Sequence, residues 1–274
     1  MNNADDSDSL RPENISGYLR TAFLGRKIIY YETLDSTNSE ARRLAAHEEQ
    51  GTVLISEQQT AGRGRLGREW LSPKGLGIWM SFILKPELTT EKIPQLTLIG
   101  AAAVYLAIEE AGIHLPGIGL TIKWPNDVFL NGKKAGGILT EMQLRDHRPS
   151  EVIVGIGLNV NSHEADFPDT LRNTATSFQI ETGAVQNRQK ITAEILNAYE
   201  SLYLDYLKSG DLGRTLTICR ARSEVIGKEV WLERNQSRHT ARILDLGAQG
   251  ELIAELENGT IQTVISGEVS LRFS

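Results

Sequence analysis

The stretch that decides the fold is Thr121-Ile-Lys-Trp-Pro-Asn-Asp-Val-Phe-Leu-Asn-Gly-Lys-Lys-Ala-Gly-Gly-Ile-Leu-Thr-Glu141. Apolar runs lie on both sides of Asn131-Gly132, and an Asn-Gly pair in that position is the strongest short-range signal for a β-hairpin. Proline is confined to the edges and breaks of sheets, so Pro125 is expected to interrupt the first arm and to turn Asn126 and Asp127 out of the ladder. The sequence therefore predicts an antiparallel hairpin near the middle of the chain.

A loop rich in glycine and arginine precedes this hairpin, at Gln59-Thr-Ala-Gly-Arg-Gly-Arg-Leu-Gly-Arg-Glu-Trp70. Glycine loses much backbone entropy in helices and strands, and the arginines repel one another, so neither regular structure is favoured. Glycines leave backbone N–H groups open to an anion, while Arg63, Arg65 and Arg68 offer planar forks that match phosphate or carboxylate oxygens. The loop therefore indicates a site for a negatively charged ligand; the alternative is a solvated surface loop.

Two common nucleotide motifs do not fit this loop. Gly62-x-Gly64-x-x-Gly67 has the spacing of the dinucleotide-binding fingerprint, but that motif must open a helix, and here the turn residues Ser72-Pro-Lys-Gly75 follow. A Walker A loop ends in Gly-Lys followed by Ser or Thr, and no such string occurs in the chain. A Rossmann or P-loop nucleotide fold is therefore not expected.

Further elements surround the hairpin and the loop. Pro12 opens a short helix whose apolar stripe runs to Phe23, and residues 1–10 are expected to be disordered. We predict strands at residues 27–32, 52–57, 76–84 and 151–160, and longer helices at residues 36–49, 93–111 and 190–208. From residue 223 the sequence pattern changes to that of short strands separated by turn signals. Five strands are predicted, at residues 225–232, 241–246, 252–256, 261–265 and 269–273, and they suggest a small closed barrel.

Three local features point to ligand contacts but also have structural readings. Ser36-Thr37-Asn38 is a helix N-cap, and the capped end of a helix also receives anionic oxygens. Gly155 and Gly157 lie on one face of their strand and leave a slot, either for a flat ligand or for a packed neighbour. The paired glycines Gly136-Gly137 on the return arm of the hairpin likewise mark the close approach of a backbone or a ligand.

The composition is that of an ordinary globular chain, with 274 residues of which 40% are apolar. A net charge of −6 argues against wholesale nucleic-acid binding. The single cysteine, Cys219, excludes intrachain disulfides and fits a reducing compartment. The histidines show no pair at metal-ligand spacing, and we find neither a signal-peptide core nor a run of membrane-spanning length. We therefore expect a cytoplasmic protein with no membrane partner and no metal site built by the protein alone.

Taken together, several segments resemble the signature segments of biotin protein ligases, and they occur in the order typical of that family from about residue 27 to the end. These segments are Gly62-Arg-Gly-Arg-Leu-Gly-Arg-Glu-Trp70, Lys123-Trp-Pro-Asn-Asp127, Lys134-Ala-Gly-Gly-Ile-Leu139, Gly155-Ile-Gly-Leu-Asn159 and Ser266-Gly-Glu-Val-Ser-Leu271. The resemblance implies an α+β fold like that of class II synthetases, with a mixed, mainly antiparallel central sheet and flanking helices. It also implies an SH3-like C-terminal barrel, and hence an N-terminal tail and short helix (1–26), a catalytic domain (27–222) and the barrel (223–274).

The resemblance assigns roles to individual positions. The residues implied to bind biotin are Ser36, Thr37, Asn38, Gln59, Arg63, Gly64, Arg65, Lys134, Gly155 and Gly157. The residues implied to bind the nucleotide are Arg68, Trp70, Asn126 and Asn159. The residues implied to act in catalysis are Arg65, Lys134 and Asp127, and the sequence leaves open whether Asp127 holds a metal ion or the amine of the acceptor lysine.

The activity implied is that of an ATP-dependent ligase. Biotin would be activated as biotinyl-5′-AMP, with Mg²⁺ carried in on ATP, and then transferred to a lysine of a biotin carboxyl carrier protein. An edge strand of the central sheet would allow a homodimer. The family members that repress transcription carry a winged helix-turn-helix, for which the 26 residues before the catalytic domain leave no room, so no nucleic-acid partner is expected. The rival interpretations are a lipoate or octanoate ligase, a ligand-sensing DNA binder, and a protein that holds biotin without turnover.

Overall fold

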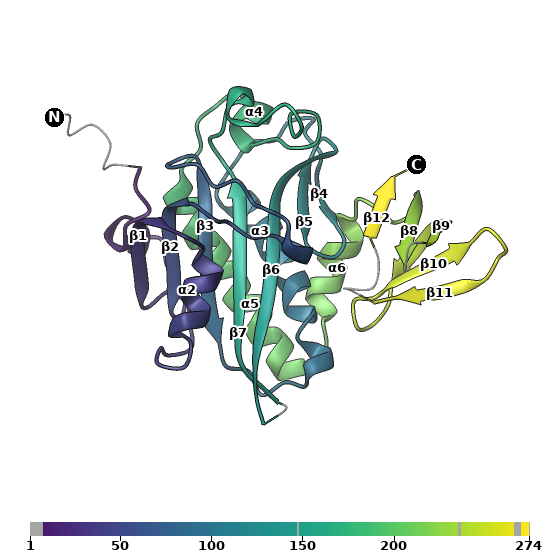
Figure 1. Ribbon diagram of the computed structural model, residues 1–274, viewed down its shortest axis with the longest axis horizontal. Coiled ribbons are helices and arrows are strands. Elements are labelled where there is room, and N and C mark those ends of the chain that lie inside the picture. The colour runs from purple at the N-terminus through teal and green to yellow at the C-terminus, as the bar shows by residue number, and fades with distance from the viewer. Residues whose placement is uncertain (1–7, 147, 235–236, 266–269, 274) are drawn as a thin grey trace.

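A seven-stranded sheet organises most of the chain in the computed structural model, which describes residues 8–146, 148–234, 237–265 and 270–273 (Figure 1). Its strand order is β1-β2-β3-β7-β6-β5-β4, and only β1 and β2 pair in parallel. The sheet is therefore mixed and mainly antiparallel, as expected. The strands are β1 (Ile28–Leu34), β2 (Val53–Gln59), β3 (Gly77–Leu84), β4 (Leu120–Lys123), β5 (Asp127–Leu130), β6 (Lys133–Arg145) and β7 (Arg148–Asn159).

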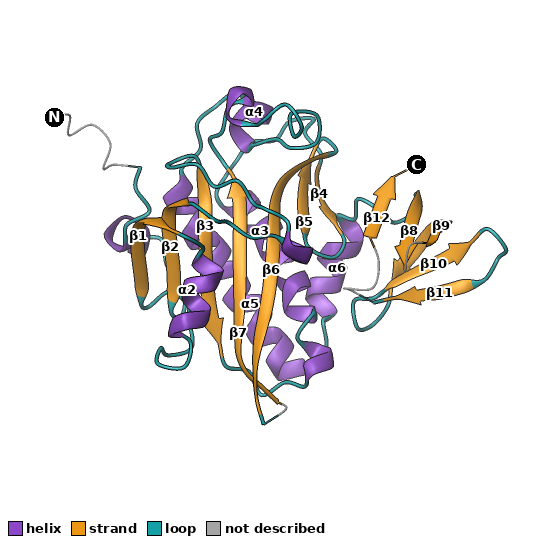
Figure 2. Ribbon diagram, viewed as in Figure 1, coloured by secondary structure: helices purple, strands orange, loops and turns teal. Residues whose placement is uncertain are grey.

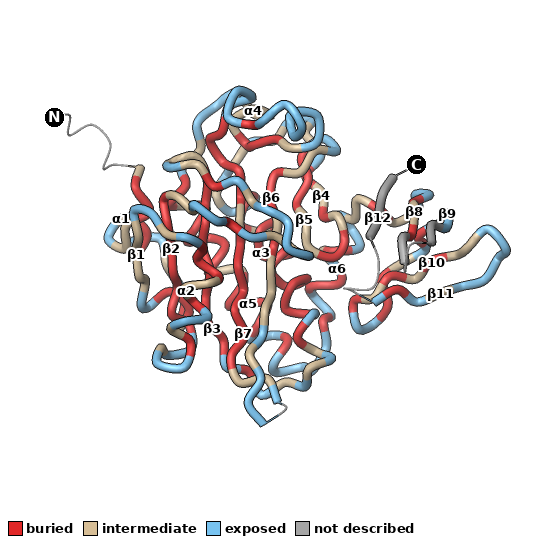
Figure 3. The backbone as a smooth tube through the Cα atoms, viewed as in Figure 1, coloured by how far each residue is buried: buried red, intermediate tan, exposed pale blue. Residues whose placement is uncertain are grey.

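Helices cover both faces of this sheet (Figure 2). On one face α2 buries Ala41 and Ala45 against Leu54 and Ile83, whereas α3 and α5 pack against the opposite face in a larger apolar core. Because both faces are covered, every residue of β3 is buried, and β3 is red in Figure 3, whereas much of β6 is only partly buried. The helices are α1 (Pro12–Ser16), α2 (Thr37–Leu44), α3 (Gln95–Glu110), α4 (Phe178–Thr182), α5 (Arg188–Ser209) and α6 (Gly213–Ala221), with 3₁₀ turns at Arg65–Gly67, Thr90–Lys92 and Glu164–Asp166.

The segment Thr90–Glu110 is long and apolar enough to span a membrane, which the sequence analysis did not recognise. In the fold, 78% of its most apolar window is buried inside the protein. Side chains on nearly every face of α3 are buried, because the helix lies between the sheet and α5. This burial is typical of the core helix of a globular domain.

The predicted hairpin is confirmed. Asn131 and Gly132 both have positive φ angles, at 48° and 77°, as a two-residue hairpin turn requires. The Trp124–Pro125 peptide is cis, and Asn126 lies in the tight turn between β4 and β5. The prediction for Asp127 is wrong, because this residue starts β5 and pairs with Lys123 and Gly137. Pro125 lies in the turn that reverses the chain, and Asp127 pairs with Lys123 directly across that turn.

Three further boundaries differ from the sequence analysis. The first helix ends at Ser16, because the backbone N–H groups of residues 22–24 donate to the Glu200 carboxylate of α5 instead of continuing a helix. Helix α2 ends at Leu44, five residues early, where the chain enters a polar turn that leads to Gly51 at φ 89°. Residues 8–10 are ordered: Leu10 is fully buried and its N–H donates to Glu57. Residues 1–7 lie outside the described residues.

The C-terminal part forms a second, five-stranded antiparallel sheet beside α6 (Figure 1). The strand order is β11-β10-β9-β8-β12, so the five predicted strands are confirmed, although Val269 lies outside the described residues. The strands are β8 (Glu229–Arg234), β9 (Ser237–Leu246), β10 (Leu252–Leu256), β11 (Ile261–Val264) and β12 (Ser270–Phe273). Helices α4 and α6 had no counterpart in the sequence analysis.

The turn between β9 and β10 docks the small sheet on the large one. The indole N–H of Trp124 donates to the carbonyl of Gly250 at 2.7 Å, and both groups are buried. Gln95 donates from its amide to the Gln249 side chain, also at 2.7 Å. Gly250 has φ 84°, and a β-carbon there would overlap Leu98 of α3. The close approach at Gly250 therefore supports the residue that precedes Pro125.

We expect Gly250→Ala to lower the free energy of unfolding by about 2–4 kcal/mol, because it combines a left-handed backbone with overpacking against Leu98. Gly259→Ala is the matched control, since Gly259 also has a positive φ but a β-carbon there meets open space. The control should lose only about 1 kcal/mol. Urea unfolding measures both, and equal losses would contradict this account of the docking turn.

Candidate active site

A cavity of about 520 Å³ opens on the α2 side of the sheet, over β6 and β7. The loop at residues 59–71, the turn between β4 and β5 and the segment at residues 167–175 close around it. Every site residue proposed from the sequence lines this cavity, although these residues are far apart in the chain. They are Ser36, Thr37, Asn38, Gln59, Arg63, Gly64, Arg65, Arg68, Trp70, Asn126, Asp127, Lys134, Gly155, Gly157 and Asn159.

The start of α2 forms one end of the cavity. Ser36 caps the helix, because its hydroxyl accepts the N–H of Ser39, so the predicted cap is confirmed. The N–H and the hydroxyl of Thr37 both donate to Gln59, and the Gln59 amide donates to Ser72. These bonds hold the beginning of α2 against the base of the Gly/Arg loop. The cap therefore also places hydrogen-bonding side chains in the cavity.

The two glycines of β7 leave slots that site side chains occupy. A β-carbon on Gly155 would overlap the amide oxygen of Asn38. A β-carbon on Gly157 would lie 2.6 Å from Nε1 of Trp70, and the Trp70 ring also passes within 3.4 Å of the β-carbon position of Gly137. The predicted slot is thus confirmed, and its occupants are one amide from α2 and one indole from the loop. Glycine is required at both positions because any side chain would expel these groups.

Trp70 lies over Gly137 and Gly157 of the sheet, next to Lys134. The Nζ atom of Lys134 lies 5.2 Å from the centroid of the indole ring, within the range of a cation–π contact. The indole N–H is buried and has no hydrogen-bond partner among the described residues. A buried donor without a partner is unfavourable, and it is typical of a position where a ligand supplies the acceptor.

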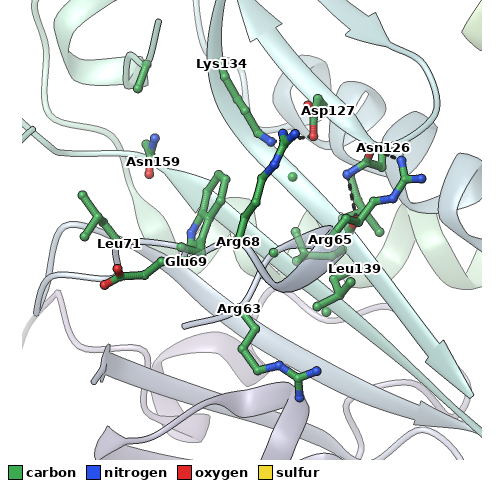
Figure 4. Close-up of a pocket in the computed structure, with 18 of the residues that line it drawn as sticks. Arg63, Arg65, Arg68, Glu69, Leu71, Asn126, Asp127, Lys134, Leu139 and Asn159 are labelled. Atoms are coloured by element: carbon green, nitrogen blue, oxygen red, sulfur yellow. Dashed lines mark hydrogen bonds and ion pairs between the residues drawn. The ribbon is translucent and has the colours of Figure 1, made fainter. Parts of the chain in front are cut away.

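Positive charge gathers next to Lys134, where the Arg65 and Arg68 side chains also lie (Figure 4). Lys134 Nζ lies 2.7 Å from Asp127 Oδ1, and Arg65 donates to the Asn126 side chain at 2.8 Å. Figure 4 shows the Arg68 side chain extending toward Lys134 and Asp127. Three cations therefore face one carboxylate, and this excess of positive charge favours an anionic ligand.

Burial affects the most enclosed of these cations. Desolvation lowers the pKa of the Arg65 guanidinium, the nearby Asp127 carboxylate opposes this shift, and Arg68 adds to it. An arginine nevertheless stays protonated at neutral pH. Arg65 is therefore a charged group in a partly desolvated position, where its interaction with an anion is stronger than in water.

Arg63 points away from this cluster (Figure 4). Its guanidinium donates to Glu141 at 2.9 Å and to the Ser39 hydroxyl at 3.4 Å. The backbone of Arg63 and Gly64 lines the cavity, whereas the Arg63 side chain ties the loop to β6 and α2. Among the three loop arginines, two face the cationic end and one anchors the loop.

The sequence analysis missed one wall of the cavity. The segment between β7 and α4 supplies Phe167, Leu171, Asn173, Thr174 and Ala175. It is held in place because the N–H of Lys134 donates to Thr174 and the amide of Asn159 donates to the carbonyl of Thr176. No motif marks this wall. Its only signal is a pair of apolar residues in an otherwise polar loop, which sequence alone does not place beside Lys134.

A metal centre is not evident in the part of the chain that the structure describes: no three His, Cys, Asp or Glu side chains gather there. Asp127 is the one carboxylate at the cationic end, and Lys134 already neutralises it. A divalent cation would therefore need most of its ligands from the phosphate groups of a nucleotide.

Comparison with known proteins identifies the family. Residues 30–159 match the family model for the biotin/lipoate A/B protein ligase family, and residues 225–272 match that for the biotin protein ligase C terminal domain. The bifunctional ligase/repressor BirA of Bacillus subtilis (strain 168) is 39% identical over 92% of this chain and 76% of its own length. The biotin--[acetyl-CoA-carboxylase] ligase of Mycobacterium tuberculosis is 30% identical over 97% of this chain and 99% of its own length.

A solved structure agrees with these sequence matches. Biotin protein ligase from Aquifex aeolicus in complex with biotin and ATP superimposes with a TM-score of 0.76 and 31% identity, covering 91% of this chain and 100% of that one. The sequence and structural matches together confirm the resemblance drawn from the signature segments. The chain belongs to the biotin/lipoate A/B protein ligase family and, within it, to the biotin protein ligases.

Proposed function

We propose that this protein attaches biotin to a lysine of a biotin carboxyl carrier protein in two steps that consume ATP. The observation that carries the proposal is one cavity in which a cationic end adjoins the Asn38 amide and the Trp70 indole, which are seated over Gly155 and Gly157. Such a cavity suits a ligand with a polar ring at one end and a carboxylate that must meet a phosphate at the other. The relatives support the same ligands, since the Aquifex structure contains biotin and ATP.

Biotin would lie along β7, from the start of α2 toward Lys134. Its ureido ring offers one carbonyl and two N–H groups, which Ser36, Thr37, Asn38 and Gln59 match with hydroxyl and amide groups. Gly155 makes room for the Asn38 amide beside the ring. The backbone of the loop would cover the ligand, and Lys134 and Arg65 would receive the carboxylate. The separation of polar and cationic ends along one strand therefore sets the orientation of biotin.

The nucleotide would occupy the far side of Trp70. The indole offers a flat surface on which a purine can stack, and Phe167 and Leu171 supply an apolar wall opposite. Asn159 and Asn126 border this space with amide groups, and Arg68 extends over it. The unpartnered Trp70 N–H would then find its acceptor on the nucleotide or the adenylate.

Adenylation would proceed without a nucleophilic side chain. The carboxylate of biotin attacks the α-phosphorus of ATP and pyrophosphate leaves, while Arg65 and Lys134 offset the charge that gathers on the phosphoryl oxygens. Mg²⁺ carried by ATP would neutralise part of the phosphate charge. Lys134 must turn from Asp127 toward the phosphate. The carboxylate that it leaves is then available either to Mg²⁺ or to the ammonium group of the acceptor lysine.

Transfer would follow when the acceptor amine attacks the carbonyl of the adenylate and AMP leaves. The adenylate is a mixed anhydride that water can hydrolyse, so the loop must exclude solvent until the amine arrives. The loop covers the cavity and its Arg65 is bonded to Asn126, which suits this role. Catalysis here depends mainly on positioning and on charge stabilisation.

The proposal extends to the organisation of the whole protein. Residues 1–26 would be a tail with a short helix, residues 27–222 the catalytic domain, and residues 223–274 a C-terminal domain whose five strands curl into an SH3-like barrel. A homodimer would form through an exposed edge strand of the large sheet, of which β1 and β4 are the two edges. We propose that the protein works in the cytoplasm with its carrier protein, which its single cysteine supports, and a net charge of −6 disfavours a nucleic-acid partner.

The direct test is to incubate the protein with biotin, MgATP and a biotin carboxyl carrier domain. We expect one lysine of the carrier to gain the mass of a biotinyl group, and we expect ATP–pyrophosphate exchange that depends on biotin. Lys134→Ala should lower the exchange rate by about 10²–10³, because it removes a donor that faces the transition state. Exchange that depends on lipoate or octanoate instead of biotin would favour the rival ligase.

Arg65→Ala should release the adenylate and weaken biotin binding, because the loop loses both its cation and its bond to Asn126. Biotin affinity by calorimetry and the rate of adenylate hydrolysis measure the two effects. Arg214→Ala is a suitable control, since Arg214 pairs with Asp205 on the surface of α5 and α6. An unchanged affinity together with an unchanged adenylate half-life would contradict the role of Arg65.

The two slots of β7 should be separable by matched substitutions. Gly155→Ala displaces Asn38, so we expect biotin binding to weaken by at least about tenfold with a smaller effect on ATP. Gly157→Ala displaces Trp70, so the larger loss should be in ATP affinity. Equilibrium binding of biotin and of ATP to both variants provides the measurement. If Gly155→Ala mainly weakened ATP binding and Gly157→Ala mainly weakened biotin binding, the biotin and nucleotide subsites would have to be exchanged.

A further inference from the structure

We infer that Glu141, a carboxylate of β6 behind the cavity wall, is a positioning residue that orients Asn38 and anchors the Gly/Arg loop. The inference rests on the proposed function, because Asn38 and the loop matter to biotin only if this cavity binds it. Glu141 lies outside the signature segments that were quoted from the sequence, and it does not line the cavity. Its influence would pass through the two residues to which it is bonded.

Each oxygen of Glu141 serves a different part of the site. Oε1 accepts a hydrogen bond from Nη2 of Arg63 at 2.9 Å, and Oε2 accepts one from Nδ2 of Asn38, also at 2.9 Å. The Glu141 side chain is only 22% exposed and its bond to Asn38 is partly buried, whereas the Arg63 side chain is 44% exposed. Hydrogen bonds to an ionised group are shorter and stronger than neutral ones. One carboxylate thus joins the loop, the start of α2 and the central sheet.

The bond to Asn38 decides which way its amide points. Nδ2 faces two acceptors, the Glu141 carboxylate and the carbonyl of Leu139. The opposite atom, Oδ1, faces the hydroxyl of Ser81 at 2.6 Å and lies in the slot over Gly155. A carboxylate accepts but does not donate, so Glu141 excludes the flipped amide. The carbonyl of Asn38 is therefore held against Ser81 and Gly155, and this fixes the orientation of the amide that lines the cavity.

The bond to Arg63 holds the loop at a point that the reaction leaves alone. Arg65 is bonded to Asn126 inside the cavity, and an incoming phosphate would compete for its guanidinium. Figure 4 shows the Arg63 side chain turned away from the cationic end, and Arg63 pairs with Glu141. It would therefore persist while Arg65 exchanges partners. The loop stays attached at one end while the other end responds to substrate.

Limited trypsin digestion without biotin or ATP tests the anchor directly, because the bonds after Arg63, Arg65 and Arg68 are potential cleavage sites. Glu141→Gln keeps the shape but presents an NH₂ group to one of two donors. We expect it to accelerate cleavage in the loop about five- to tenfold, since cleavage follows the population of the open loop. Glu40→Gln is the matched control, because Glu40 is 18% exposed and pairs with Arg43 but contacts neither Arg63 nor Asn38. The control should cleave at the wild-type rate.

Biotin binding and steady-state kinetics test the orientation of Asn38. For Glu141→Gln we expect a rise of about five- to tenfold in the Kd and KM for biotin, with kcat at saturating biotin within about twofold, because the residue touches no reacting atom. In an Arg63→Ala background, Glu141→Gln should no longer accelerate cleavage but should still weaken biotin binding. This difference between loop cleavage and biotin binding would separate the anchoring of the loop from the orientation of the Asn38 amide. A residue with a merely structural role would not produce such a difference.

The inference is overturned if Glu141→Gln leaves both loop cleavage and biotin affinity unchanged. It is also overturned if Glu40→Gln produces the same changes, since the cause would then be a general loss of stability, or if the Glu141→Gln effect on cleavage survives fully in the Arg63→Ala background. A wild-type protein that binds no biotin would overturn the proposed function instead. In that case the digestion experiment would still decide whether Glu141 anchors the loop.

Discussion

Two positions without side chains on β7 are the constraint on which the site depends. Gly155 admits the Asn38 amide and Gly157 admits the Trp70 indole, and both approaches are too close for any other residue. These two groups come from opposite ends of the proposed ligand channel. Because β7 lies in the middle of the sheet, its backbone is held on both sides by β3 and β6 and gives the cavity a rigid floor. Rigid elements hold a site more accurately than loops do.

The charges are arranged in the cavity above that floor. Lys134 is paired with Asp127 and Arg65 is bonded to Asn126, so the cations are held by weak local partners until an anion arrives. A phosphate group offers more charge than either partner and can replace both. The protein as a whole is acidic, with a net charge of −6, which makes this cluster a local feature and confines anion binding to one place.

The C-terminal sheet is coupled to this site through packing. Its β9–β10 turn contacts α3 and accepts the Trp124 hydrogen bond, and Trp124 lies just before the turn that presents Asn126 and Asp127. Glu141 has an equivalent role on the other side, where it joins α2 and the loop to β6. The residues that touch the proposed substrates are thus supported by residues that do not, as positioning by a second layer of contacts requires.

Local patterns in the sequence determined the Asn131-Gly132 hairpin, the Ser36 cap and the strand of Gly155, because each depends on residues within a few positions of one another. The site residues that were assigned from the signature motifs also line one cavity in the structure. Only the tertiary structure decided where the first two helices end, that Asp127 stays in the ladder, and that the apolar wall at 167–171 and Glu141 border the site. These features depend on contacts between segments that are tens to more than a hundred residues apart, such as Glu141 with Asn38. A single sequence without tertiary contacts contains no local signal for such pairings, because burial and packing of distant segments override local propensity.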